Sequence, residues 1–395
     1  MKRVLIIGNR IPLPARDGGA LAILQILKLY VKAGFEVDFV TLNTSKHFVT
    51  EDIIHSELDF LNSIEKVNID TQLKLGALLK NLLLSAKSYN LSRFYSKELE
   101  DLILRKIQEN EYDCIHIESL FAATVLPVLK QNFQRPIYIR VHNIEHQIWQ
   151  RMAENEQNIF KRKYLKIMAQ RLQKEELLLL SLANGLLHIS NSDLAFFESQ
   201  LPAVKHIYLP FVVEENTQIE YPDATPASVG FIGSLEWLPN QHGLDWFLDK
   251  VWANVRVAIP DAVLRIAGKN IPDKYRSDEH CGIEVMGEVQ YANNFMHQQQ
   301  VLIVPLFSGS GIRIKTIEAM ANGIAVVSTT IGAQGLGVVP GEDILIADTA
   351  KDFSKALILL LTNEMLRLKL KKNGESFVQH NHNESKAISV LKSLC

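Results

Sequence analysis

The fold class of this chain is decided by one stretch, Phe307-Ser-Gly-Ser-Gly-Ile-Arg-Ile-Lys-Thr-Ile-Glu-Ala-Met-Ala-Asn-Gly323. A turn rich in glycine and serine follows an apolar run and leads into a helix that carries Arg313, Lys315 and Glu318. Free backbone N–H groups and the positive end of the dipole make a helix N-terminus favourable for anions. The stretch predicts a nucleotide or phosphosugar site, in which the cations neutralise a diphosphate and the acid binds hydroxyl groups.

Helix geometry limits how these side chains act together. At about 100° per residue, Gly311, Lys315 and Glu318 fall on one face. Arg313 points away from that face in a regular helix, so both cations reach one diphosphate only if Arg313 belongs to the loop or to a distorted first turn. The alternative is a surface pair of Lys315 with Glu318, worth roughly a few tenths of a kcal/mol. We favour a ligand site because glycines, serines and charges converge at one helix start.

Size and composition restrict the class of protein. A chain of 395 residues is comfortable for two domains, each with its own core. A formal net charge of -2 gives no bulk attraction to nucleic acid. Cys114, Cys281 and Cys395 are odd in number and far apart, which predicts free thiols in a reducing compartment. No cluster with metal-ligand spacing is evident, so no metal is expected.

The sequence predicts a cytoplasmic protein, at most peripheral at the inner face of a membrane. No stretch reaches the roughly 18 uninterrupted apolar residues that a membrane span needs. Residues 73–91 are rich in leucine with interspersed lysines, and this segment could lie on a membrane or meet a lipid-linked acceptor. Such a helix more often packs against its own domain.

Both halves alternate apolar strands with helical segments, as expected for parallel sheets covered on both faces. In the first domain, residues 1–210, strands are expected at 4–7, 37–41, 114–117, 137–141 and 186–189, with a helix over 20–33; the pattern falters from Lys205. A polar, proline-containing linker follows over 211–227. In the second domain, residues 228–374, strands are expected at 229–232, 263–267, 284–286, 301–304 and 325–328, with a helix over 243–257. Residues 375–395 are expected to form a helix that packs back towards the first domain.

The predicted fold class is therefore α/β, with two Rossmann-like, doubly wound parallel sheets that face a central cleft. Ligands of such sheets bind at the carboxyl ends of the strands. Gly18 and Gly19, in the loop after the first strand, would let the backbone approach a ligand closely. Their spacing is not G-x-G-x-x-G, which argues against a dinucleotide fingerprint and hence against a dehydrogenase. A helix-start turn without a ligand accounts for this loop equally well.

His142 immediately follows the expected strand 137–141, where a side chain faces the ligand of a doubly wound sheet. Its imidazole could hydrogen-bond a sugar hydroxyl or a phosphate oxygen. The alternative is that His142 and Asn143 cap the next helix.

Three glycines end strands of the second domain: Gly233, Gly268 and Gly287. They suggest close backbone approach to a flat ligand such as a nucleobase, although ordinary turns also use glycine.

Taken together, three segments resemble the retaining glycosyltransferases of family 4, also called glycosyl transferases group 1, which have the GT-B fold. These segments are 231–243, 308–320 and 327–336. The resemblance implies transfer of a sugar from a nucleoside-diphosphate sugar to a glycan, lipid-linked or small-molecule acceptor, as in polysaccharide biosynthesis. It implies no further cofactor and no metal.

The resemblance also implies roles for single residues. Glu318 matches the second glutamate of the E-x7-E motif and would bind the ribose hydroxyls. His142 would touch the transferred sugar, and Gly18 and Gly19 would approach the donor phosphate or that sugar. The remaining donor-binding residues are expected to be Gly233, Ser234, Gly268, Glu288 and Val289, the last two beside the base, and Ser310, Gly311 and Ile312, through backbone N–H groups.

Two departures from the family pattern concern charge. Ser310 stands at the first glutamate of E-x7-E, and Ser234 stands where many members carry an arginine. A lysine of those members is also missing, at Gln241 or His242. We infer that Arg313 and Lys315 supply the missing positive charge to the leaving diphosphate.

No second carboxylate is evident as a nucleophile, so same-face, leaving-group-assisted transfer with retention is expected. Two alternatives remain open: another GT-B enzyme, either an inverting transferase or a sugar-nucleotide epimerase, and a non-catalytic two-domain protein that binds sugar nucleotides. The Ser310 substitution supports the second.

Overall fold

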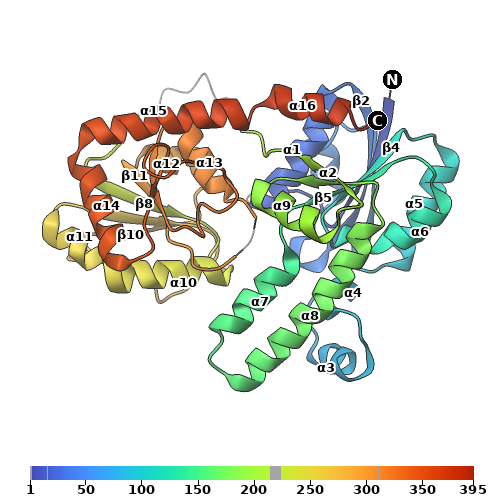
Figure 1. Cartoon of the computed structure of the whole chain (residues 1–395), viewed down its shortest axis with the longest axis horizontal. Coiled ribbons are helices and arrows are strands. Elements are labelled where there is room, and N and C mark those ends of the chain that lie inside the picture. Colours follow the sequence, from blue (N-terminus) through green and yellow to red (C-terminus); the bar gives the residue numbers. More distant parts are fainter. Residues whose placement is uncertain (1, 16, 214–223, 310) are drawn as a thin grey trace. The chain divides into compact units, whose positions relative to one another are not determined.

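The computed structural model describes residues 2–15, 17–213, 224–309 and 311–395. The chain divides into two compact units, the N-terminal unit of residues 1–211 with 384–395 and the C-terminal unit of residues 212–383. Each unit is built on one parallel sheet with packed helices (Figure 1). The predicted α/β class with two Rossmann-like sheets is confirmed.

Seven strands form the N-terminal sheet in the order β3-β2-β1-β4-β5-β6-β7. The order reverses between β1 and β4, which pair in parallel with Gly8 opposite Glu118. The strands are β1 (Lys2–Gly8), β2 (Phe35–Thr44), β3 (Ser63–Ile69), β4 (Cys114–Glu118), β5 (Ile137–Val141), β6 (Gly185–His188) and β7 (Lys205–Tyr208).

The expectation that the sheet pattern falters at Lys205 is wrong, because β7 pairs with β6 as the edge strand. Its residues are exposed or only half-buried and include Lys205 and His206, so it lacks a continuous apolar run. The other edge strand, β3, has the same mixed character and was also not predicted.

Helices cover both faces of the N-terminal sheet. Helices α1 (Gly18–Lys32) and α16 (Glu384–Lys392) pack together on one face, and α5 (Lys97–Glu109) and α6 (Leu126–Asn132) lie on the other. The antiparallel helices α7 (Glu145–Asn155) and α8 (Ile159–Ser181) extend away from the sheet (Figure 1). The remaining helices of this unit are α2 (Glu51–Glu57), α3 (Leu75–Leu84), α4 (Tyr89–Ser92), α9 (Asn191–Gln200) and two short 3₁₀ turns, Ser45–His47 and Ala122–Val125.

Six strands form the C-terminal sheet in the order β10-β9-β8-β11-β12-β13, which reverses between β8 and β11. They are β8 (Ser228–Ile232), β9 (Val263–Ala267), β10 (Ile283–Gly287), β11 (Val301–Val304), β12 (Ala325–Ser328) and β13 (Leu345–Ile346). Helices α10 (Leu238–Phe247), α11 (Ala253–Ala258) and α14 (Ala350–Thr362) lie on one face, and α12 (Ala292–His297), α13 (Ile314–Ala321) and α15 (Glu364–Asn381) on the other (Figure 1).

The helix expected over 243–257 begins earlier and is irregular. It starts at Leu238 with Pro239 in its first turn, where the missing N–H of proline does no harm. A π-helical turn, Leu248–Trp252, joins α10 to α11.

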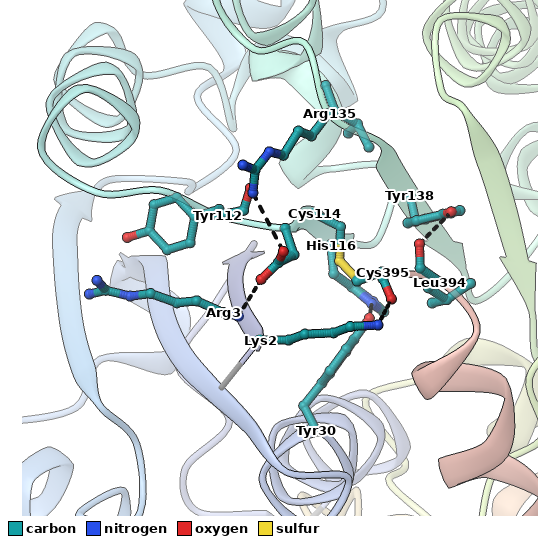
Figure 2. The surroundings of a disulfide bond; sticks show 12 residues. Lys2, Arg3, Tyr30, Tyr112, Cys114, His116, Arg135, Tyr138, Leu394 and Cys395 are labelled. Carbon is teal, nitrogen blue, oxygen red and sulfur yellow. Dashed lines mark hydrogen bonds and ion pairs between the residues drawn. A yellow bond between two sulfur atoms is a disulfide. The ribbon is translucent and has the colours of Figure 1, made fainter.

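The expectation of free thiols is wrong for two of the three cysteines. Cys114, at the start of β4, forms a disulfide with Cys395 (Figure 2). Cys281 is free and exposed. The hydroxyl of Tyr138 donates a hydrogen bond of 2.8 Å to the backbone oxygen of Leu394, which holds the same terminal segment to β5 (Figure 2). The two cysteines are 281 residues apart, so only the tertiary fold reveals the pair.

The chain returns to the N-terminal unit at Glu384, rather than at residue 375, because α15 belongs to the C-terminal unit. Much of the proposed linker, at 214–223, lies outside the described residues. Among the helices that the structure describes, none is long and apolar enough to cross a membrane.

Candidate active site

Lys315 lies at the switch point of the C-terminal sheet. Its ammonium donates hydrogen bonds to the backbone oxygen of Ile232, the last residue of β8, at 2.9 Å, and to Oδ1 of Asn240 at 3.2 Å. It also lies 4.8 Å from the centre of the Phe231 ring. Strands β8 and β11 are neighbours at which the strand order reverses, and ligands of doubly wound sheets bind at such points.

Arg313 precedes α13 and is not part of the regular helix. It is the N-cap residue, with φ −95° and ψ 91°, and its backbone oxygen accepts the first helical hydrogen bond from Thr316 at 2.8 Å. Its guanidinium lies 5.2 Å from the centre of the Trp237 ring. The geometric condition for Arg313 and Lys315 to act on one anion, that Arg313 belong to the loop, is therefore met.

The loop before α13 needs glycine for its backbone path. Gly311 has φ +76°, a conformation that residues with a side chain rarely adopt. Ile312 is buried and anchors the loop beside it. Ser310, the third residue of the expected N–H set, lies outside the described residues.

Two pKa values at this helix are shifted towards neutrality. Burial, and next the charge of Arg313, lower the pKa of Lys315 to about 7. Burial alone raises the pKa of Glu318, one helical turn further on, to about 7. Among the described residues Lys315 is paired with neither Glu318 nor any other carboxylate, so the surface pair considered above does not form. A cation that is desolvated in this way gains most from an anionic ligand.

The glycines at the strand ends serve two different purposes. A Cβ on Gly268 would lie 1.9 Å from the backbone oxygen of Gly233, so the close approach of neighbouring strand ends requires glycine there. A Cβ on Gly233 would lie 2.8 Å from Nδ2 of Asn240 and 3.1 Å from Nζ of Lys315. Gly233 therefore keeps space open for the lysine.

The two residues expected beside the base lie further out. Glu288 and Val289 follow β10, which β9 separates from β8 in the sheet order. Glu288 is exposed and Val289 is half-buried.

Asn240 is a residue of the candidate site that the sequence analysis missed. It is buried in the first turn of α10, where its Nδ2 donates to the backbone oxygen of Ser234 at 2.8 Å while its Oδ1 accepts from Lys315. A signal was present, because Asn240 lies within the 231–243 segment beside Gln241 and His242. Its residue type alone does not identify it as a partner of lysine.

His142 lies at the carboxyl end of β5 in the N-terminal unit and is held by a carboxylate. Its Nε2 lies 2.6 Å from Oε2 of Glu118, the last residue of the neighbouring strand β4. The capping alternative does not apply, since the N-cap of α7 is Ile144 and the backbone N–H groups of Glu145 and His146 in its first turn donate to the Glu176 carboxylate.

A buried polar network surrounds Glu118. Its Oε1 accepts from Arg140 at 3.2 Å and pairs with Nε2 of His116 at 3.1 Å, and Nδ1 of His116 pairs with the Tyr30 hydroxyl at 3.0 Å. Although burial opposes ionisation, the charges of Arg140 and His142 and the hydrogen bonds hold the pKa of Glu118 well below its usual range. The sequence analysis missed Glu118, because it ends a short strand that otherwise has an apolar pattern.

Gly18 and Gly19 form the first turn of α1, after β1. The Asp17 side chain caps this helix by accepting from the backbone N–H of Ala20 at 3.0 Å, and Arg10 donates to Asp17 at 3.0 Å. A Cβ on Gly19 would lie 2.7 Å from Nη2 of Arg10, so this glycine gives room to the arginine. Strand β1 is separated from β5 by β4, so the glycines and His142 lie along the same edge of the sheet.

The structure thus brings Gly233, Arg313 and Lys315 together in one unit, and His142 together with Glu118 in the other. Among the described residues, no group of three or more histidines, cysteines and acids could hold a metal ion.

Comparisons with known proteins agree with this architecture. Residues 226–363 match the family described as glycosyl transferases group 1. A Klebsiella pneumoniae protein, named an uncharacterized 44.6 kDa protein in cps region, is 29% identical over 417 residues, with 99% of each chain covered. Sucrose-phosphate synthase from Thermosynechococcus elongatus is similar in structure, with a TM-score of 0.68 and 17% identity over 100% of this chain and 98% of the other. Alr3699/HepE from Anabaena in complex with UDP-glucose has a TM-score of 0.65 and 12% identity, over 100% and 99% of the chains.

The class of protein follows from the fold. The chain has two Rossmann-like parallel sheets and matches these neighbours over their full length, which is the GT-B architecture. Residues 226–363 are similar to the family of glycosyl transferases group 1. The chain is a transferase enzyme, a glycosyltransferase.

Proposed function

We propose that this enzyme transfers a sugar from a nucleoside-diphosphate sugar to a glycan, lipid-linked or small-molecule acceptor with retention of anomeric configuration. One observation carries the proposal: the Lys315 ammonium, whose hydrogen-bond partners among the described residues are neutral, lies at the switch point of the C-terminal sheet beside the start of α13. Cleavage of the donor puts negative charge on the departing diphosphate, and positive groups placed in advance lower that barrier.

The position of Lys315 supports its role as the cation of the leaving group. Its ammonium reaches the end of β8, the place from which many relatives would project an arginine and a lysine. Arg313 adds a second positive charge close enough to contribute to the lowered pKa of Lys315. Metal-independent, same-face transfer is part of the proposal, and this assignment is compatible with it.

The donor is assigned to the residues around these cations. Glu318 takes the ribose hydroxyls, Ser310, Gly311 and Ile312 take the diphosphate through backbone N–H groups, and Glu288 and Val289 take the base. Since Alr3699/HepE is described in complex with UDP-glucose, uridine nucleotides are the first donors to test.

In the N-terminal unit, His142 takes the transferred sugar, and Gly18 and Gly19 approach the donor. Glu118 fixes the orientation of His142, because the hydrogen bond of 2.6 Å at Nε2 leaves Nδ1 as the nitrogen for a ligand.

The decisive experiment has two stages. Thermal unfolding with UDP, GDP and ADP and their sugars identifies the donor, because a ligand that binds only the folded state raises its stability. NMR of the product then gives its anomeric configuration. Retention supports the proposal, whereas inversion assigns the chain to the inverting transferases. Donor binding without turnover, even with acceptor supplied, would favour the non-catalytic alternative, which Ser310 at the usual glutamate position supports.

A further inference from the structure

Two segments of the N-terminal unit contain lysine and arginine but no aspartate or glutamate. Residues 73–91 contain three cations and no acid, and residues 159–174 contain six cations and no acid, in a chain whose net charge is -2. The cations are Lys74, Lys80, Lys87, Lys161, Arg162, Lys163, Lys166, Arg171 and Lys174. We call these two segments together the basic face.

The structure joins the two segments. Arg171, in the middle of α8, donates to the backbone oxygens of Asn81 at 3.2 Å and Leu82 at 3.0 Å, in the last turn of α3. Figure 1 shows α3 beside α8, on the part of the α7–α8 pair that extends from the sheet. The two segments of the basic face therefore lie side by side on a projecting element.

Large apolar side chains are exposed on the same segments. Leu83 and Leu84 are each 78% exposed, and Ile159 and Phe160 are 74% and 87% exposed. Burying such side chains is favourable by roughly 1.5–3 kcal/mol each. What sets these four apart from other exposed apolar residues is that they lie on the same two segments as the nine cations.

Few of the cations are neutralised within the protein. Lys74 pairs with Asp70 at 2.8 Å and Lys161 with Glu156 at 2.6 Å. None of the other seven cations forms an ion pair with an acid in the described part of the chain.

We propose that the basic face docks on the surface of an anionic lipid bilayer, with Leu83, Leu84 and Phe160 entering the headgroup region and the lysines facing the lipid charges. Exposed leucines and an aromatic among lysines on a helix are the pattern of interfacial membrane binding. Each basic residue near an anionic surface contributes about 1 kcal/mol. An enzyme docked on a bilayer meets acceptors that are anchored in the same bilayer, which favours a lipid-linked acceptor. This further step rests on the proposed function.

Flotation of the full-length protein with vesicles tests this directly. Vesicles of phosphatidylcholine with phosphatidylglycerol should bind the protein, and vesicles of phosphatidylcholine alone should bind it much more weakly. Leu83→Ser with Leu84→Ser, and separately Lys163→Glu with Lys166→Glu, should each lower the partition coefficient by roughly tenfold or more.

Matched controls come from exposed positions of the C-terminal unit, Val257→Ser with Leu359→Ser and Lys351→Glu with Lys355→Glu, which should bind like the unaltered protein. Failure of the unaltered protein to bind anionic vesicles overturns the proposal. Binding by both basic-face variants that equals that of the unaltered protein also overturns it. Thermal shift by the donor nucleotide, measured without lipid, shows that each variant is folded. It also keeps this test separate from that of the proposed function.

Discussion

The carboxyl edges of the two sheets differ in whether a buried charge has an oppositely charged partner. In the N-terminal unit, Arg140 and His142 share the buried carboxylate of Glu118, whose pKa is held well below its usual range. In the C-terminal unit, the described partners of the Lys315 ammonium are a carbonyl, an amide and an aromatic ring, and burial together with the charge of Arg313 lowers its pKa to about 7.

The difference separates positioning from binding. A buried charge that is already compensated gains little from a ligand, and its main effect is to fix the geometry of its neighbours. A desolvated charge with neutral partners gains the full interaction with an anion. The comparison therefore supports the proposal that the diphosphate binds at the C-terminal edge and that the N-terminal network orients His142.

The largest expected effect comes from removing the uncompensated cations. Arg313→Ala combined with Lys315→Ala should lower kcat by about 10³-fold or more, because each positioned donor contributes roughly 10²–10³. Turnover is measured at saturating donor, with Lys351→Ala plus Lys355→Ala as the control. Unchanged turnover in the Arg313 and Lys315 variant would refute the phosphate assignment.

Removing the compensating charge of the N-terminal edge should act on stability. Glu118→Gln leaves Arg140 buried without its carboxylate and should lower the free energy of unfolding by about 3 kcal/mol. Glu111→Gln is the control, since its pair with Arg135 at 3.6 Å is on the surface and contributes at most about 1 kcal/mol. An equal free energy of unfolding for the two variants would show that the network does not depend on the charge of Glu118.

Asn240→Asp should make the C-terminal edge resemble the N-terminal one. A carboxylate beside Lys315 would raise the pKa of the lysine and compensate its charge internally. Donor affinity should then fall roughly tenfold, a cost of about 1.4 kcal/mol. Isothermal titration of the donor measures it, with Asn240→Ala separating the added charge from the lost hydrogen bonds. Affinity in Asn240→Asp that equals or exceeds that of Asn240→Ala would contradict the comparison.

The pH dependence of donor binding is the smallest expected effect. Since the pKa of Lys315 is about 7, the ammonium is lost as pH rises through neutrality, and a bound diphosphate favours its protonated form. Donor affinity should therefore fall with rising pH, by at most about tenfold per unit above pH 7. The trend should persist in Glu318→Gln, which removes the other group of α13 whose pKa is shifted to about 7, and disappear in Asn240→Asp. A flat profile in the unaltered protein would mean that Lys315 keeps its proton without a ligand.

The sequence predicted strands best where the chain is buried on both faces. The bounds expected for 137–141, 263–267, 301–304 and 325–328 are those of β5, β9, β11 and β12. The edge strands β3 and β7 escaped prediction, because an edge position permits polar residues and removes the continuous apolar run.

At the candidate site, residue type alone identified the charged residues that lie next to a glycine-rich turn. Lys315 and Arg313 could be proposed from the sequence because two cations beside glycines at a helix start are typical of an anion site. Asn240 and Glu118 could not, because their roles depend on neighbours 75 and 24 residues away along the chain. The same reason hid the partner of Cys114.

That disulfide changes the covalent topology of the enzyme. Residues 114–395 form a closed ring, and the whole C-terminal unit lies within it, because the chain leaves the N-terminal unit after residue 211 and re-enters at residue 384. A single cut of the backbone anywhere inside the ring leaves both pieces covalently joined. The C-terminal unit is thus an insertion with two connections to the rest of the chain. Its release requires either a cut in both connections or one cut together with reduction of the disulfide.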